Sequence, residues 1–472
     1  MRRAAAMLAL LSTSCVSLEP NYVRPAPAVP VSWPAGDSYL AQSEAGLPAV
    51  TYKDIFRDPR LQALIVQALA NNRDLMAAAA NIAAAREQYH IQRAGQLPQV
   101  DAGAGVTATG DKSRSVSASY TAGLSVPSFE LDLFGRLRSL THAEFARYLA
   151  TEAGARSTRL ALVASIADAW LTHSADSSLL TIAQETARSA ATSVRLTRAR
   201  LEGGVAPRTD LRQAEQILTA AQADVAQQTT LVAQDVNALQ LLVGAPIDPA
   251  LLPKSIAEAA PTVAQLPAGL DSSILLRRPD VVEAEYQLRA ANAQIGAARA
   301  ALFPKISLTG LLGLASSALS SLFTGGAFAW SAGANATYAI FNGGAGRASV
   351  RLSEAQRAAA VANYQKAIQT AFREVADALA RRGTMGDELD ARRRQDEAAA
   401  DNARLSEARY KAGIDNFLAT LDAERSYYAA QRTLVQTQLE SAQNLVDLYQ
   451  SLGGDDLLRS TPLQPFPASS PR

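Results

Sequence analysis

Alternating small and apolar positions mark two pairs of β-strands in this chain. In residues 99–109 and 119–130, apolar or alanine side chains alternate with glycine and polar ones, and a polar loop separates the two stretches. Residues 305–314 and 331–341 repeat the pattern around a longer loop. Period-two alternation is typical of strands with two unlike faces. Runs of about ten residues also suit a tilted transmembrane strand, so we predict two membrane-spanning hairpins.

The longer loop, residues 315–330, is rich in serine and glycine and contains Phe323, Phe328 and Trp330. Aromatic side chains gather where a membrane meets water. They also pack into small clusters within loops, and the sequence leaves both interpretations open.

Proline-free helical stretches follow each hairpin, over residues 136–202 and 347–411. Apolar side chains recur at intervals of seven in them, as at Val361, Ile368 and Val375, which is typical of coiled-coil packing. A continuous helix of this length would extend roughly 100 Å. Return helices are expected over 209–243 and 418–452, each ending at glycine. An earlier helical region, 58–96, is expected to break near residues 71–72.

These elements occur twice in the same order, which indicates an internal duplication. Three pairs of landmarks correspond: Asp74 with Asp280, Pro98 with Pro304, and the Arg200–Gly204 turn with the Arg409–Gly413 turn. The repeated unit of about 200 residues is far longer than a solenoid repeat. We place the first repeat at 58–244, a connector at 245–271 and the second repeat at 272–454.

The N-terminus predicts export and a lipid anchor. Residues 1–14 combine Arg2 and Arg3 with an apolar run and small residues, as a signal peptide does. Cys15 follows directly and is the only cysteine, which excludes a disulfide framework and a thiolate metal site. Its position resembles a lipoprotein processing site, and acylation there would anchor the chain without spanning the membrane. The alternative is a cleaved signal peptide followed by an incidental cysteine.

Proline-rich residues at both ends complete the domain plan. Residues 15–57 are predicted to be extended, and residues 455–472 to be a disordered tail. The 45 basic and 44 acidic residues leave no charge pattern suited to nucleic acid.

Charge and hydropathy then restrict how the chain could cross a bilayer. No apolar run after the signal peptide reaches the length of a membrane helix, so crossing requires a closed β-barrel. Four strands cannot close alone, whereas three chains would supply twelve. The predicted fold class is therefore mainly α with a membrane β part: an internally duplicated chain whose coiled-coil-like helices form a trimeric α-barrel, joined to a 12-stranded β-barrel.

Catalytic signals are absent from the sequence. The three histidines, His90, His142 and His173, have no helical i, i+4 partner, so no metal site is predicted. The glycine-rich residues 343–346 lack the Gly-Lys-Ser/Thr of a phosphate-binding loop. We expect no enzyme activity, and no cofactor beyond the covalent lipid on Cys15.

Three segments, residues 15–25, 129–136 and 409–424, resemble the outer-membrane efflux factor family (TolC/OprM-like), in its lipoprotein NodT-like branch. The resemblance implies a homotrimeric duct in the outer membrane of a Gram-negative bacterium, lipid-anchored and extending into the periplasm. Such a duct passively conducts small toxic compounds, namely drugs, organic solutes or metals. Its partners are a periplasmic adaptor, an inner-membrane RND-type pump and outer-membrane lipid. The alternatives are a type I protein-secretion duct and a non-conducting structural lipoprotein, although a spacer has no need of membrane-length strands.

The resemblance also implies a gate at the periplasmic tip. Leu418 and Asp422 match positions that form successive narrowing rings in these ducts. They lie one helical turn apart on one face, and a ring of carboxylates would repel or bind a cation. In the alternative, Leu418 packs inside the bundle, and Asp422 is solvated or pairs with an arginine.

Turn residues at the same end are candidates for adaptor contact, namely Gly203, Gly204 and Gly413. The alternative is that glycine only permits the sharp reversal. Asp210 and Asp415 are candidates for tip electrostatics. Asp415 stands where relatives can carry a basic latch residue, which puts a latch of that kind in doubt. Asp422 corresponds to Gln213 in the first repeat and Asp210 to Ala419 in the second, so the two repeats are not interchangeable here.

Overall fold

A computed structural model describes residues 17–30, 32–34, 36, 39, 51–110, 116–264, 272–453 and 455. The predicted signal peptide, Cys15 and the tail beyond residue 455 lie outside these ranges. The chain divides into two compact units. The sheet unit comprises Asn81–Ala153 and Val282–Lys366 with the N-terminal segment up to Pro27, and the hairpin unit comprises Ala28–Ala80, Gly154–Val281 and Ala367–Arg472. Each unit thus combines equivalent parts of both sequence repeats.

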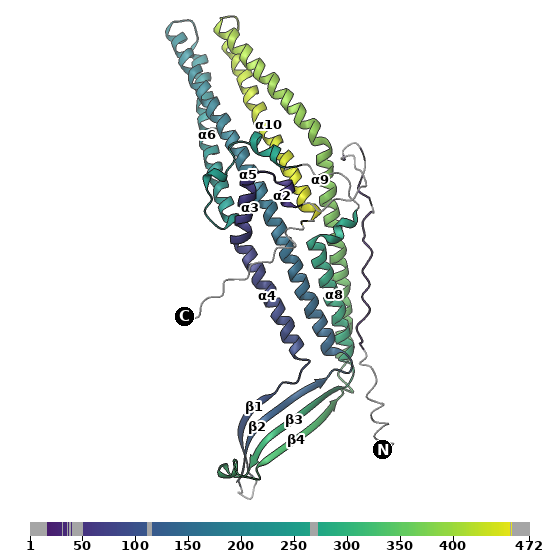
Figure 1. The fold of residues 1–472 in the computed structure, drawn as a ribbon. Helices are drawn as coiled ribbons and strands as arrows, with labels where there is room; N and C mark the ends of the chain where they lie inside the picture. The colour runs from purple at the N-terminus through teal and green to yellow at the C-terminus, as the bar shows by residue number, and fades with distance from the viewer. Residues whose placement is uncertain are drawn as a thin grey trace. The chain divides into compact units, whose positions relative to one another are not determined.

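Helices account for most of the described residues (Figure 1). In chain order they are α2 Tyr52–Ile55, α3 Pro59–Asn71, α4 Arg73–Ala94, α5 Arg136–Glu202, α6 Arg208–Val243, α7 Ile256–Ala259, α8 Pro279–Ala300, α9 Ala345–Lys411 and α10 Phe417–Leu452. The long helix α5 coincides with the predicted 136–202, and α9 begins two residues before the predicted 347–411. Among the described residues, none of the helices is long and apolar enough to cross a membrane.

The four strands are β1 Asp101–Gly110, β2 Val116–Leu131, β3 Lys305–Ser316 and β4 Phe328–Thr337. They form one antiparallel sheet in the order β1-β2-β3-β4 (Figure 1). The central β2–β3 ladder therefore joins the hairpin of the first repeat to that of the second. Within the described chain β1 and β4 are the edges of this sheet.

The fourth strand differs from its prediction of 331–341. It begins at Phe328 and ends at Thr337, which pairs with Lys305. Pro304 precedes Lys305 and has no N–H to extend the ladder, so the paired segment stops there. Phe328 and Trp330 consequently belong to β4 rather than to the loop, and they pair across the sheet with leucines of β3.

Two further predicted boundaries also change. The short helix α2 lies inside 15–57, which was expected to be extended. Asp455, the first residue of the expected disordered tail, is buried, and its carboxylate accepts hydrogen bonds from the Tyr52 N–H and the Tyr449 hydroxyl at 2.7 Å each. The buried residues of this unit therefore include Asp455, one residue past the predicted end of the second repeat, and its carboxylate has the donors that a buried polar group needs.

The predicted break between α3 and α4 has a clear cause in the hairpin unit. The side-chain oxygen of Asn72 accepts from the Leu75 N–H at 3.0 Å, and its amide donates to the Leu242 carbonyl at 2.8 Å. Asn72 thus caps α4 and ties the junction to the end of α6. A Cβ on Gly244 would lie 2.5 Å from the Asn71 carbonyl oxygen, so glycine permits this close approach.

Residues 17–27 carry no helix or strand, and they are fastened to α8 within the sheet unit. The buried carboxylate of Glu285 accepts from Arg24 at 2.5 Å, from the Tyr22 hydroxyl at 3.2 Å and from Arg289 at 2.7 Å. Burial raises the pKa of Glu285, but the hydrogen bonds from the two arginines outweigh it and hold the pKa below its usual range. The Asn292 amide also donates to the Pro20 carbonyl at 2.7 Å.

We expect Glu285→Gln to release this N-terminal segment, because it removes the charge that pairs with Arg24 and Arg289. Loss of a buried, charge-assisted hydrogen-bond set costs about 1–3 kcal/mol. Chymotrypsin cleavage after Tyr22, whose hydroxyl also donates to Glu285, should then become severalfold faster. Glu354→Gln is the control, since Glu354 forms an exposed ion pair with Arg299 in the same unit. A Glu285→Gln cleavage rate equal to that of the wild type would contradict this prediction.

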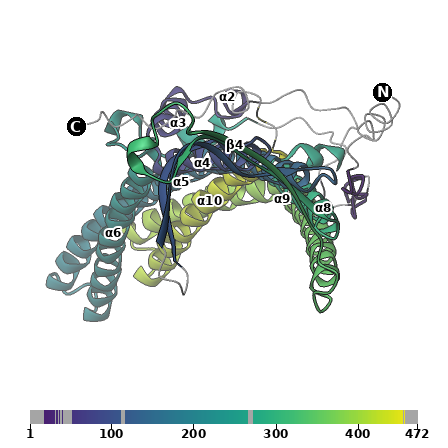
Figure 2. The same ribbon diagram turned by 90° about the horizontal axis from the view of Figure 1, so that it is seen from below.

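The hairpin unit contains two helical hairpins, and Figures 1 and 2 show α6 beside α5 and α10 beside α9. Of the heptad positions predicted from the sequence, Ile368 and Val375 are buried in this unit, whereas Val361, in the sheet unit, is half-buried. The Trp170 indole N–H donates to the Leu251 carbonyl at 3.0 Å, so the bulky ring is both packed and satisfied.

Candidate functional site

The two hairpins of this unit turn around in the same way. After α5, the Gly204 N–H donates to the Leu201 carbonyl and the Val205 N–H donates to the Arg200 carbonyl, at 3.0 and 2.9 Å. After α9, residues 413 and 414 donate to residues 410 and 409 at the same two distances. Paired bonds of this kind define a Schellman helix ending. The sequence duplication is therefore a duplication of backbone geometry at this end.

Glycine is required in these turns by backbone conformation rather than by space. Gly204 has φ +72° and Gly413 has φ +74°, and a Cβ on either would meet nothing within 4 Å. Gly203, which precedes Gly204, has an ordinary backbone conformation. The apolar residues that follow, Val205 and Ile414, are 69% and 64% exposed. Each turn thus presents one apolar side chain to its surroundings.

A small apolar cluster packs the two hairpins together just behind the turns. Its buried members come from all four helices: Val194, Leu211, Ala214, Tyr410, Phe417 and Leu421. The Tyr410 and Phe417 rings lie 5.2 Å apart between centroids. This cluster fixes which faces of the helices point outward.

Leu418 and Asp422 lie on the outward face of α10. Their neighbours Phe417 and Leu421 are buried in the cluster, whereas Leu418 is 52% exposed and Asp422 is exposed. The alternative in which Leu418 packs inside the bundle therefore does not hold within this chain. Among the described residues Asp422 has no arginine partner, so it presents a carboxylate one turn from an exposed leucine.

Equivalent arginines of the two turns have different partners. Arg409 forms an ion pair with Asp415 of its own turn at 2.5 Å, and its hydrogen bonds lower the pKa of Asp415. Arg200 instead reaches the other hairpin, where it lies 4.7 Å from the centre of the Tyr410 ring and donates to the Tyr410 carbonyl at 3.5 Å. Asp415 is thus the acceptor of a charge pair within its own turn.

Asp210 lies in the first turn of α6, and its N–H donates to the Pro207 carbonyl at 3.2 Å. A negative charge is favourable at this end of a helix because of the helix dipole. Asn416 caps the N-terminus of α10, because its side-chain oxygen accepts from the Ala419 N–H at 3.0 Å. The two hairpins therefore begin their return helices with different polar groups.

Sequence reasoning missed the contact between Arg200 and Tyr410. The signal was present, because Arg200 and Arg409 occupy equivalent positions in the duplicated turn motif. The repeat makes both arginines visible, but only the packing of one hairpin on the other shows that they have separate partners.

Comparison with known proteins places the chain in a family. The family model "Outer membrane efflux protein" matches residues 64–245 and 270–454. This chain belongs to the outer membrane efflux protein family. The two matched segments coincide closely with the two repeats read from the sequence, and the predicted family is confirmed.

Individual relatives of this outer membrane efflux protein agree with the assignment. The antibiotic efflux pump outer membrane protein ArpC and the toluene efflux pump outer membrane protein TtgC, both of Pseudomonas putida, are each 44% identical over 95% of this chain and 94% of theirs. The open state of the MtrE outer membrane channel of Neisseria gonorrhoeae is 36% identical, with a TM-score of 0.83 over 93% of this chain and 98% of that one.

The family and these relatives confirm the predicted role as an efflux duct. The protein is an outer-membrane exit duct of an efflux system, and its mainly helical, duplicated fold with a membrane β part is that of the outer-membrane channels. Its location is the outer membrane, from which the fold extends into the periplasm. The alternative of a non-conducting spacer is not supported.

Proposed function

We propose that three copies of this chain close a barrel of twelve strands and conduct efflux cargo through it. The observation that carries the proposal is the order β1-β2-β3-β4, which leaves β1 and β4 as long edges. In lipid, unpaired backbone groups cost several kcal/mol each, so edges must be paired. Neighbours in the sheet are antiparallel, and β4 of one copy beside β1 of the next continues that alternation with an even total.

Leu418 and Asp422 are proposed to form the gate. Repeated around a threefold axis, their exposed side chains would give an apolar ring and, one turn away, a ring of carboxylates. An apolar constriction opposes the passage of water and ions, and a carboxylate ring attracts multivalent cations. Together they would keep the tip closed until a partner opens it.

Planar-bilayer conductance tests this gate. We expect Leu418→Ala combined with Asp422→Ala to open severalfold more often than the wild type, and Asp422→Ala alone to lose block by a trivalent cation. Asp401→Ala is the control, because Asp401 is an exposed carboxylate that pairs with Arg404 on α9. Wild-type opening and wild-type block in all three variants would refute the gate.

A covalent lipid on Cys15 is proposed to hold the N-terminus at the membrane. The segment that follows, from Ser17 onward, is fastened to α8 through Glu285 and Asn292, so an anchor at residue 15 would be tied to the sheet unit. A lipid contributes about 0.8 kcal/mol per buried methylene. Intact-mass analysis of the purified protein would show the acylated species, which Cys15→Ala should lack.

The tip turns are proposed to contact a periplasmic adaptor, which links the duct to an inner-membrane RND-type pump. The exposed Val205 and Ile414, set by Gly204 and Gly413, provide repeated apolar contacts at this end. Asp210 adds negative charge beside them and would favour a partner with basic groups, whereas Asp415 and Arg409 offer a charge pair that such a partner could exchange.

Small organic compounds are the proposed cargo. Two relatives are named for efflux of antibiotics and of toluene, which favours this cargo over secreted proteins. Deleting the gene and measuring sensitivity to a panel of antibiotics, dyes, solvents and metals would test this. Unchanged sensitivity to all of them would contradict it.

A further inference from the structure

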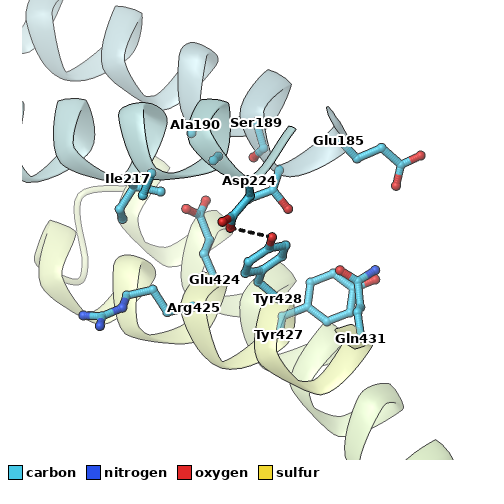
Figure 3. Close-up of a pocket in the computed structure, with 13 residues that line it drawn as sticks. Glu185, Ser189, Ala190, Ile217, Asp224, Glu424, Arg425, Tyr427, Tyr428 and Gln431 are labelled. Carbon is cyan, nitrogen blue, oxygen red and sulfur yellow. Dashed lines mark hydrogen bonds between the residues drawn. The ribbon is translucent and has the colours of Figure 1, made fainter. Parts of the chain in front are cut away.

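A cavity of about 380 Å³ lies within the hairpin unit, between α5, α6 and α10 (Figure 3). On the α5 and α6 sides the lining is half apolar, with Ala190, Ile217, Ala220 and Ala221, and half polar, with Glu185, Thr186, Ser189 and Asp224. Glu185 has a cation of its own, since it lies 3.8 Å from Arg188. On the α10 side it is lined by Glu424, Tyr427, Tyr428 and Gln431. Alanines facing two tyrosines create the space, and its size falls within the range of small-molecule sites.

The polar groups of the cavity differ in their partners. Asp224 accepts a hydrogen bond from the Tyr428 hydroxyl at 2.7 Å, drawn as a dashed line in Figure 3, and lies 4.0 Å from Arg432. Burial and then this bond raise the pKa of Tyr428 to about 12, so the hydroxyl stays a neutral donor. The charge of Asp224 is therefore already matched by groups of the protein.

Glu424 differs from its equivalent in the first repeat. Glu215, its counterpart, pairs with Arg212 at 2.6 Å and with Arg198 at 3.3 Å. The two repeats are related by an offset of 209 residues, from Arg200 to Arg409 (409 − 200 = 209). By this offset, Leu421 occupies the position of Arg212, and Glu407 the position of Arg198. The second repeat thus keeps the carboxylate and lacks both of its cations.

The surroundings of Glu424 disfavour its charged form. Burial raises the pKa of Glu424, and the like charge of Glu407 raises it further. Lys411 opposes them but forms its own ion pair with Glu407 at 2.6 Å. Arg425 also lines the cavity, but Figure 3 shows its guanidinium directed away from the Glu424 carboxylate. Within the described chain, Glu424 accordingly has no cation partner.

We propose that this cavity binds a monovalent organic cation with an apolar or aromatic body. Glu424 supplies the opposite charge, and the Tyr427 and Tyr428 rings offer cation–π and stacking contacts. The alanines and Ile217 receive the apolar body. A fixed organic cation would take the place that Arg198 and Arg212 hold beside Glu215. The proposal does not need the chain to conduct, because binding occurs within one subunit.

Binding to purified wild-type protein in lipid nanodiscs tests the site, with ethidium as the probe and fluorescence anisotropy as the readout. Ethidium should bind saturably, tetraphenylphosphonium should displace it, and tetraphenylborate, of the same shape and opposite charge, should not. Glu424→Gln should weaken binding at least tenfold. Glu215→Gln is the matched control, since it makes the same change at the equivalent position and should stay within twofold of the wild type.

A second variant guards against a folding defect in the first. Ala220→Phe fills the cavity from an exposed position on α6 and should weaken ethidium binding without changing any charge. Ethidium binding is compared only among variants that elute from a size-exclusion column at the wild-type volume, which shows that they are folded and assembled alike. Absence of saturable binding, equal loss in Glu424→Gln and Glu215→Gln, or unchanged binding in Ala220→Phe would each overturn the proposal. Failure of the conductance test would leave it standing.

Discussion

Gly313→Ala is expected to abolish assembly of the sheet in the outer membrane. Gly313 of β3 faces Gly123 of β2 in the ladder that joins the two repeats. A Cβ on Gly313 would lie 2.6 Å from the Gly123 Cα, against backbone that has no rotamer to change. Overpacking costs about 1–3 kcal/mol even where side chains can adjust, so the heat-resistant oligomer on semi-native gels should be lost or strongly reduced.

Gly310→Ala is the control for this change, because it adds the same methyl group to the same strand. A Cβ there would meet its nearest atoms at 4.0 Å, which is ordinary contact. Its oligomer should match the wild type in amount. Equal yields from the two variants would show that the facing glycines do not determine strand pairing.

Asp168→Asn is expected to stabilise the protein at pH 8 and to have little effect at pH 4. Burial, and then the nearby charge of Asp447, raise the pKa of Asp168 to about 7. One of its carboxylate oxygens is buried without a hydrogen-bond partner in the described chain. Holding a charge there at pH 8 costs on the order of 2 kcal/mol, with an upper limit of about 4 kcal/mol, and the amide removes that cost.

The direction of this pH dependence follows from the linkage between proton binding and folding. Unfolded, the carboxyl has a pKa of about 3.9, so above it the unfolded chain loses its proton more readily than the folded one. The cost of folding is absent below about pH 4, grows between pH 4 and pH 7, and is complete above pH 7. Thermal unfolding followed by circular dichroism should show a Tm higher by several degrees for Asp168→Asn at pH 8 only. Asp401→Asn, at an exposed site, should leave Tm unchanged at both pH values, and a pH-independent gain for Asp168→Asn would contradict the charge argument.

Much of the fold could be predicted because its signals are local. The start and end of α5 follow from helix composition and a terminal Gly-Gly, and the Asn72 break follows from capping chemistry. Strand boundaries were less certain because a strand ends where its partner ends. β4 stops at Thr337 because Pro304 closes the ladder of β3, not because of its own residues.

The candidate site divides in the same way. The duplicated turn glycines were visible as a motif, and the structure gives both the left-handed conformation that explains them. The exposure of Leu418 was not visible, because Phe417 and Leu418 are both apolar neighbours on α10. Only the position of the apolar cluster decides that one is buried and the other faces outward.

The amino-acid sequence by itself determined the duplication, the long helices, the paired strands and the family, since each depends on residue type and spacing along the chain. Tertiary structure alone decided how equivalent residues diverged. Arg200 and Arg409 share a motif, yet the packing of one hairpin on the other places Arg200 over the Tyr410 ring, while Arg409 pairs with Asp415 of its own turn. The physical reason is that the charge balance of a side chain depends on neighbours brought together from distant segments.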